Sequence, residues 1–145
     1  MDRAQHLVAV DELVGRAFPA RAERSGFRDS GPDHHVVALA TSEEFWEDDG
    51  TRRLAVEEQY EAERDGLSTL LGARWGPPQV FSLWSVLDRS MSGEHIPEPW
   101  GVLSNHTPDV HLWRAGERWV ALGVSQWDKE LPFQLLAVVT TVDPP

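Results

Sequence analysis

The sequence predicts an α+β fold, in which N-terminal helices pack on one face of a C-terminal, mainly antiparallel sheet of about four to five strands. Three observations predict it: helical apolar spacing in the first half, short β-branched runs in the second half, and connections between those runs too short for parallel crossovers. We expect a single domain over residues 1–145, with a mostly helical part at 1–76 that includes one short strand and a sheet part at 77–145.

The first element expected is a helix over about residues 3–18. Its apolar residues recur on one face, Asp2 is available as an N-cap, and Pro19 stops it. Residues 19–34 hold Pro, Gly, Ser and scattered charge, which is typical of a surface loop without a buried element. The short β-branched run at 35–41 then predicts a strand.

Two helical segments are expected after that strand. Thr41 and Glu44 form a capping box, which predicts a helical turn containing Phe45 and Trp46. Residues 52–72 have the spacing of the longest helix in the chain. Its predicted inner stripe consists of Val56, Tyr60, Leu67, Leu70 and Leu71.

The second half is expected to form the sheet. Residues 79–88 are apolar on both faces, as a central strand would be, and the polar, proline-containing residues 89–99 form a connection. Four further strands are predicted at 100–105, 110–114, 118–127 and 132–142. If Ala115-Gly116 is a two-residue hairpin loop, the facing pairs are Arg114 with Glu117, Trp113 with Arg118 and Leu112 with Trp119; a longer loop with a shifted register remains open.

Charge and cysteine content exclude several classes of function. The net charge is −11, which disfavours direct contact with nucleic acid or with anionic membranes. The chain has no cysteine, so disulfide frameworks, thiolate metal sites and cysteine nucleophiles are excluded. No apolar run has the length of a signal peptide or a membrane span, and we therefore expect a cytoplasmic protein.

The triplet Asp33-His34-His35 resembles the signature of the DHH phosphoesterases, which use such a triplet within a two-metal site. The resemblance covers three residues, and adjacent histidines on a strand point to opposite faces. The chain also lacks Gly-x-Ser-x-Gly, a P-loop and a dinucleotide fingerprint. We therefore expect no metal, no cofactor and no catalytic residue.

Residues 43–65 carry most of the negative charge of the chain. They hold ten acids against three bases, a net of −7, with Phe45 and Trp46 among the acids. Seven tryptophans are unusual for this length; most are expected in the core, whereas Trp46 and Trp100 lie beside acids and turn residues and are expected at the surface. The predicted partner-binding residues are Glu43, Glu44, Phe45, Trp46, Glu47, Asp48, Asp49, Glu57 and Glu61.

These features favour a non-enzymatic module that binds a basic protein, because acidic surfaces with aromatic centres select cationic partners. A small, acidic, cysteine-free α+β domain also resembles the immunity proteins that neutralise bacterial toxins, although no defining motif of such a family is present. One alternative is a small-ligand-binding domain or small enzyme, with a pocket between the long helix and the sheet lined by Tyr60, Trp84, His111 and Trp113. Another is a homodimer that pairs through the uncharged strand 132–142.

Overall fold

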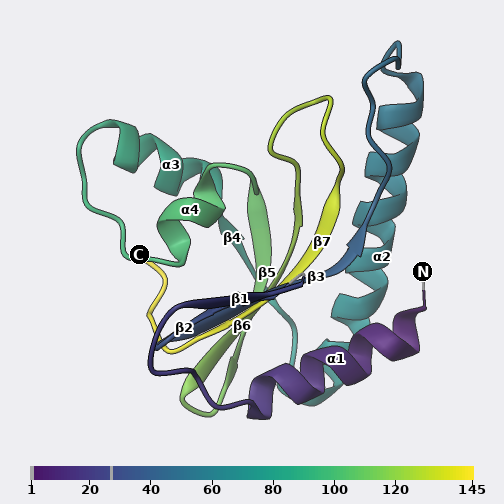
Figure 1. Ribbon diagram of the computed structural model, residues 1–145. Coiled ribbons are helices and arrows are strands. Elements are labelled where there is room, and N and C mark those ends of the chain that lie inside the picture. The colour runs from purple at the N-terminus through teal and green to yellow at the C-terminus, as the bar shows by residue number, and fades with distance from the viewer. Residues whose placement is uncertain (1, 27) are drawn as a thin grey trace.

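The computed structural model describes residues 2–26 and 28–145, and it confirms the α+β class. Seven antiparallel strands form one sheet in the order β1-β2-β3-β7-β6-β5-β4 (Figure 1). The strands are β1 (Glu23–Ser25), β2 (Arg28–Gly31), β3 (His34–Thr41), β4 (Gln79–Ser82), β5 (Asp109–Ala115), β6 (Arg118–Ser125) and β7 (Gln134–Thr140). The helices are α1 (Arg3–Gly15), α2 (Thr51–Trp75), α3 (Leu83–Met91) and α4 (Trp100–Ser104).

Helices cover both faces of the sheet. The two N-terminal helices pack on one face, as predicted, but two segments predicted as strands or parts of strands form helices that cover the other face. Helices α1 and α2 lie on one face, whereas α3 and α4 lie on the other (Figure 1). Side chains of a strand alternate between faces, and β7 shows this directly: Ala137 packs under α1 and α2, and Val138 packs under α3 and α4. A central strand covered on both faces must be apolar at every position, which accounts for the uncharged segment 132–142.

The position of β7 also removes the edge predicted for strand 132–142. Strand β7 pairs with β3 on one side and with β6 on the other, so its backbone donors and acceptors are used within the sheet. The edge strands are instead the short β1 and β4. None of the described helices combines the length and apolar composition that crossing a bilayer requires.

Residues 19–34 form two short strands where the sequence predicts only a loop. Strands β1 and β2 extend the sheet beyond β3, and Ser30 is buried against His35, with 2.6 Å between Ser30 Oγ and His35 Nδ1. The composition of the segment is polar because it lies at an edge of the sheet. Pairing with β3, and not local apolar pattern, makes it a strand.

The segment before α2 is irregular. In place of the predicted helical turn at Phe45 and Trp46 it has a single hydrogen-bonded turn, in which the N–H of Asp48 donates to the carbonyl oxygen of Phe45 at 3.4 Å. The backbone N–H of Phe45 donates to Glu130 in the β6–β7 loop, which ties the segment alongside that loop. Helix α2 begins after Gly50, whose φ of 98° lies in the left-handed region that glycine tolerates. Asp48 caps the helix, because its carboxylate accepts from the N–H groups of Arg52 and Arg53 at 3.2 and 2.8 Å.

The stripe predicted for the inner side of α2 is partly correct. Tyr60, Leu67 and Leu71 are buried, and Val56 packs against the core, but Leu70 is exposed. The helix also runs three residues beyond the predicted end at position 72.

Two predicted strands of the second half are helical. Residues 79–88 divide into the edge strand β4 and helix α3, which begins where Ser82 Oγ accepts from the N–H of Ser85. Residues 100–105 contain α4, with Trp100 and Leu103 buried one turn apart. Both runs are short and apolar, and periodicity alone does not distinguish a strand from a buried helix at that length.

The β5–β6 hairpin turns at Gly116 and Glu117, one position later than predicted. Gly116 has a φ of 65°, and the first loop position of a type II′ turn requires such a value, so glycine takes that position. The predicted pairs of Arg114 with Glu117 and of Trp113 with Arg118 are therefore wrong. Arg114 faces Trp119 instead, with its guanidinium carbon 4.7 Å from the ring centroid.

Candidate functional site

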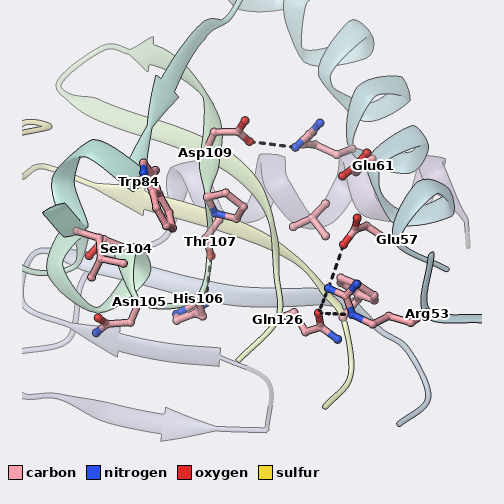
Figure 2. A pocket seen from close by; sticks show the side chains of 15 residues that line it. Arg53, Glu57, Glu61, Trp84, Ser104, Asn105, His106, Thr107, Asp109 and Gln126 are labelled. Carbon is pink, nitrogen blue, oxygen red and sulfur yellow. Dashed lines mark hydrogen bonds and ion pairs between the residues drawn. The ribbon is translucent and has the colours of Figure 1, made fainter. Parts of the chain in front are cut away.

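A cleft of about 480 Å³ separates α2 from α3 and from the α4–β5 connection (Figure 2). We call it the α2–α3 cleft. Helix α2 contributes Arg53, Glu57, Glu61 and Arg64 to one wall, and α3 contributes Trp84 and Leu87 to the other. Its volume lies in the range of about 300–1,000 Å³ that is usual for ligand pockets.

The α2 wall of the cleft is a charged stripe with a free carboxylate near its middle. Arg53, Glu57, Glu61 and Arg64 are spaced by four, four and three residues, which places them on one side of the helix. Arg53 donates to Gln126 Oε1 at 3.1 and 2.7 Å and lies 3.4 Å from Glu57, whereas Arg64 pairs with Asp109 at 3.3 Å. Within the described residues Glu61 makes no ion pair, so its negative charge is available to a ligand.

The α3 wall presents an indole to solvent. Leu83 and Val86 anchor α3 in the core, and this orientation turns Trp84 outward, where it is 71% exposed. Figure 2 shows Trp84 on the wall opposite Glu57 and Glu61. An indole next to carboxylates can bind a cation through its π face.

A neutral histidine forms part of the cleft lining. His106 lies between Thr107, whose Oγ1 is 3.0 Å from His106 Nδ1, and Trp127, whose ring stacks at 4.0 Å between centroids. Burial disfavours the charged ring and lowers the pKa of His106 to about 4. The ring is thus uncharged at neutral pH and adds no positive charge to the cleft.

The predicted partner-binding residues separate into two places. Glu57 and Glu61 reach the cleft, whereas the acids at 43–49 lie in the irregular segment beside the start of α2 (Figure 1). Trp46 is 59% exposed and its Nε1–H donates to Glu44, in line with the predicted surface position. Phe45 is buried against Phe133.

Three of the acids at 43–49 have structural partners. Asp48 caps α2, and the N–H of Thr51 donates to Asp49 Oδ1 at 3.0 Å, which lowers the pKa of Asp49. Glu43 pairs with Arg52. Glu44 and Glu47 remain without an ion-pair partner among the described residues, so the negative charges of these two carboxylates are available to a binding partner.

The pocket predicted from Tyr60, Trp84, His111 and Trp113 does not form as a unit. Tyr60 and Trp113 are 4% and 3% exposed and belong to different parts of the core. Of the four, Trp84 alone lines the α2–α3 cleft, and His111 lies in a separate, shallow depression beside α2. Trp100, predicted at the surface, is fully buried.

His111 does have a hydroxyl and a carboxylate nearby. Ser68 Oγ is 2.8 Å from His111 Nδ1, and Asp65 Oδ1 is 3.9 Å from Nε2. The second distance exceeds that of a hydrogen bond, and Ser68 is only 5% exposed, so the three side chains do not form the hydrogen-bonded chain that activates a serine nucleophile. The group is better described as a tether between α2 and β5.

The tether predicts a measurable loss of stability when the hydroxyl is removed. Ser68→Ala leaves His111 Nδ1 without its partner and is expected to lower the free energy of unfolding by about 1 kcal/mol, measured by urea denaturation. Thr69→Ala, at an exposed position of the same helix, is the control and is expected to change stability by less than about 0.5 kcal/mol. Equal effects of the two substitutions would contradict the tether.

The Asp33-His34-His35 triplet does not converge on one point. His35 is buried under α1, where its Nε2 lies 3.3 Å from the carbonyl oxygen of Arg16. His34 lies on the other face of β3 and pairs with Asp33 at 2.9 Å. Across residues 2–26 and 28–145, no group of three or more His, Asp or Glu side chains is placed to hold a metal ion.

No family model matches this chain, and neither the curated proteins nor the solved structures give a significant match. Function is therefore argued from the geometry of the cleft and of the acidic segment. Sequence reasoning did not find the part of the cleft formed by His106, Asp109 and Gln126. His106 lies in the α4–β5 connection, Asp109 begins β5 and Gln126 lies in the β6–β7 connection, whereas only the α2 stripe has a sequence signal, its spacing by four, four and three.

Proposed function

We propose that the protein is a non-enzymatic module that binds a basic partner protein through the flank formed by α2 and residues 43–50. The observation that carries the proposal is the unbalanced charge of this flank. Seven of the ten acids in 43–65 are exposed and none is buried. An exposed surface of one sign accelerates association with a partner of the opposite sign and excludes partners of the same sign.

The bases of the same segment do not cancel this charge for a partner. Arg52 pairs with Glu43, Arg53 with Glu57, and Arg64 with Asp65 and Asp109. Each guanidinium is thereby held by carboxylates of the protein itself. Glu44, Glu47, Glu58 and Glu61 are carboxylates of this flank that have neither an ion pair nor a capping role among the described residues, and they supply the attraction.

Two exposed indoles, one on this flank and one facing it, add the apolar area that binding energy requires. Trp46 lies among the acids of residues 43–49, and Trp84 of α3 lies across the cleft from Glu61. Tryptophan is enriched at the energetic centres of interfaces. The same combination of acids and aromatics suits a nuclease toxin or another nucleic-acid-binding protein as the partner, which would make the role immunity-like.

Affinity capture from the cells that produce the protein tests the proposal. The tagged chain is expected to retain a basic protein at about 50 mM salt and to release it at about 500 mM, because salt screens exposed charges. The triple variant Glu44→Gln, Glu47→Gln and Glu61→Gln is expected to lose that protein. A matched triple variant at exposed acids elsewhere, Glu12→Gln, Glu94→Gln and Glu117→Gln, is expected to retain it.

Two results of this capture would contradict the proposal. One is that no basic protein is retained at low salt by the unmodified chain. The other is equal retention by both triple variants, because the binding would then depend on total charge and not on the flank.

Small-ligand binding is the second candidate, because the α2–α3 cleft has a suitable volume and convergent polar groups, including Asn105 and Gln126. Native mass spectrometry of the chain purified from its producing cells tests it. A bound compound of a few hundred daltons, lost from Trp84→Ala, would support this function. A spectrum with the mass of the chain alone would count against it.

A further inference from the structure

We propose that the α2–α3 cleft receives a short segment of the basic partner in which one arginine is flanked by apolar side chains. This inference rests on the proposed function and assigns a place and a chemistry to part of the contact. It follows from the charges of the cleft, from its exposed indole and from its volume.

The charges of the cleft favour one added cation. Three carboxylates line it, those of Glu57, Glu61 and Asp109, against the two guanidinium groups of Arg53 and Arg64. Both guanidinium groups are held at the ends of the α2 stripe, by Gln126 and Glu57 at one end and by Asp109 at the other. One cation placed between them, beside Glu57 and Glu61, would neutralise the remaining negative charge of the cleft lining.

Arginine suits this place better than lysine. Glu57 and Glu61 are one helical turn apart, about 6 Å between their Cβ atoms, so a planar group with several N–H donors can reach both. The opposite wall carries the exposed indole of Trp84, on which a guanidinium can stack (Figure 2). An ammonium group offers neither the paired donors nor a flat face.

The remaining space calls for apolar neighbours. The cleft has a volume of about 480 Å³, within the range of sites that hold whole ligands, so one side chain does not fill it. Leu87 lies beside Trp84 in the cleft, and Met91, one turn further along α3, is 79% exposed. Leucine-like side chains on either side of the arginine would cover this apolar wall.

The test is a titration of the isotopically labelled protein with the tripeptide acetyl-Leu-Arg-Leu-amide, followed through the indole N–H signals of the tryptophans. Three indoles are more than half exposed, those of Trp46, Trp84 and Trp127. The Trp84 signal is expected to shift most and Trp46 least, because Trp46 lies outside the cleft lining. The analogue with neutral citrulline in place of arginine is expected to bind about tenfold more weakly, since it lacks the charge-assisted hydrogen bonds.

Two variants localise the binding. Glu61→Gln is expected to lower the affinity for the arginine tripeptide by about tenfold. Glu58→Gln, at an exposed position of α2 outside the cleft lining, is expected to leave this affinity unchanged. Equal binding of the citrulline tripeptide, equal weakening by both variants, or a dominant shift at Trp46 would each overturn the inference.

The outcome for the inference can be separated from the outcome for the proposed function. Suppose that a partner is captured in a salt-dependent way, and that the single variant Glu61→Gln captures it as well as the unmodified chain does. This result would show that the partner does not bind in the cleft, and it would leave the acidic flank as the binding surface. Failure to capture any basic protein would overturn the proposed function itself.

Discussion

Replacing Trp100 with alanine is expected to lower the free energy of unfolding by about 4 kcal/mol, the largest effect that we predict for one substitution in this protein. The side chain is 0% exposed and packs in the core under α3 and α4 with Leu83, Leu103 and Leu112. Its Nε1–H also donates to the carbonyl oxygen of Val142 at 3.0 Å. The substitution removes that bond and leaves a cavity that α4, a helix of five residues, cannot readily close.

The control for this prediction is the same substitution at Trp46. Trp46 is 59% exposed, and its indole N–H donates to Glu44 at the surface, so Trp46→Ala is expected to change stability by less than about 0.5 kcal/mol. Urea denaturation of both variants, followed by far-ultraviolet circular dichroism, measures the difference. Similar losses at the two positions would contradict the burial of Trp100.

Acidification is expected to destabilise the protein through His106. The pKa of this ring is about 4 in the folded protein and 6.5 in the reference state, so the unfolded chain binds more protons between those values. The contribution to stability is therefore complete above pH 6.5 and falls as the pH decreases towards 4. The full difference corresponds to roughly 3 kcal/mol, and partial access of solvent lowers it to about 2 kcal/mol.

The variant His106→Gln isolates this contribution. It lacks the titrating ring, and its free energy of unfolding is expected to depend less steeply on pH between 6.5 and 4 than that of the unmodified protein. His6, His35 and His111, whose pKa values are also lowered by burial, are present in both proteins, and so are the carboxylates. Urea titrations at a series of pH values give the comparison. Parallel curves for the two proteins would contradict a neutral, buried His106.

Much of the secondary structure followed from local pattern. Helix α2 has 25 residues with a buried stripe, and β5, β6 and β7 are largely apolar runs of seven or eight residues bounded by turn residues, so local pattern predicted them. The errors fall where a segment is short. Strand β2 forms by pairing with β3, and β1 forms by pairing with β2. Helix α3 begins at its Ser82 cap inside a run predicted as one strand, and α4 is a helix whose Trp100 and Leu103 are buried one turn apart.

The candidate site has two components, the acidic residues of 43–65 and the α2–α3 cleft, and the sequence predicted the position of the first. The concentration of acids at 43–65 is a property of composition, and their exposure follows from the cost of burying an unpaired charge. The cleft is different, because its lining residues on α2 (53–64) and on α3 (84–87) are 20 or more residues apart in sequence. Its lining also includes Asp109, which begins β5, and Gln126 from the β6–β7 connection. No local pattern reports which of these residues meet.

The order of residues by itself determined the α+β class, the long helix, the uncharged strand within 132–142 and the sign of the charge around α2, since each depends on a residue and its near neighbours in the chain. Tertiary structure alone decided that the sheet is covered on both faces, that Trp100 is buried while Trp84 is exposed, and that Glu61 faces an indole across a cleft. The physical reason is that burial and pairing are set by contacts between distant segments. The same apolar residue contributes to a core or to a binding surface according to what packs against it.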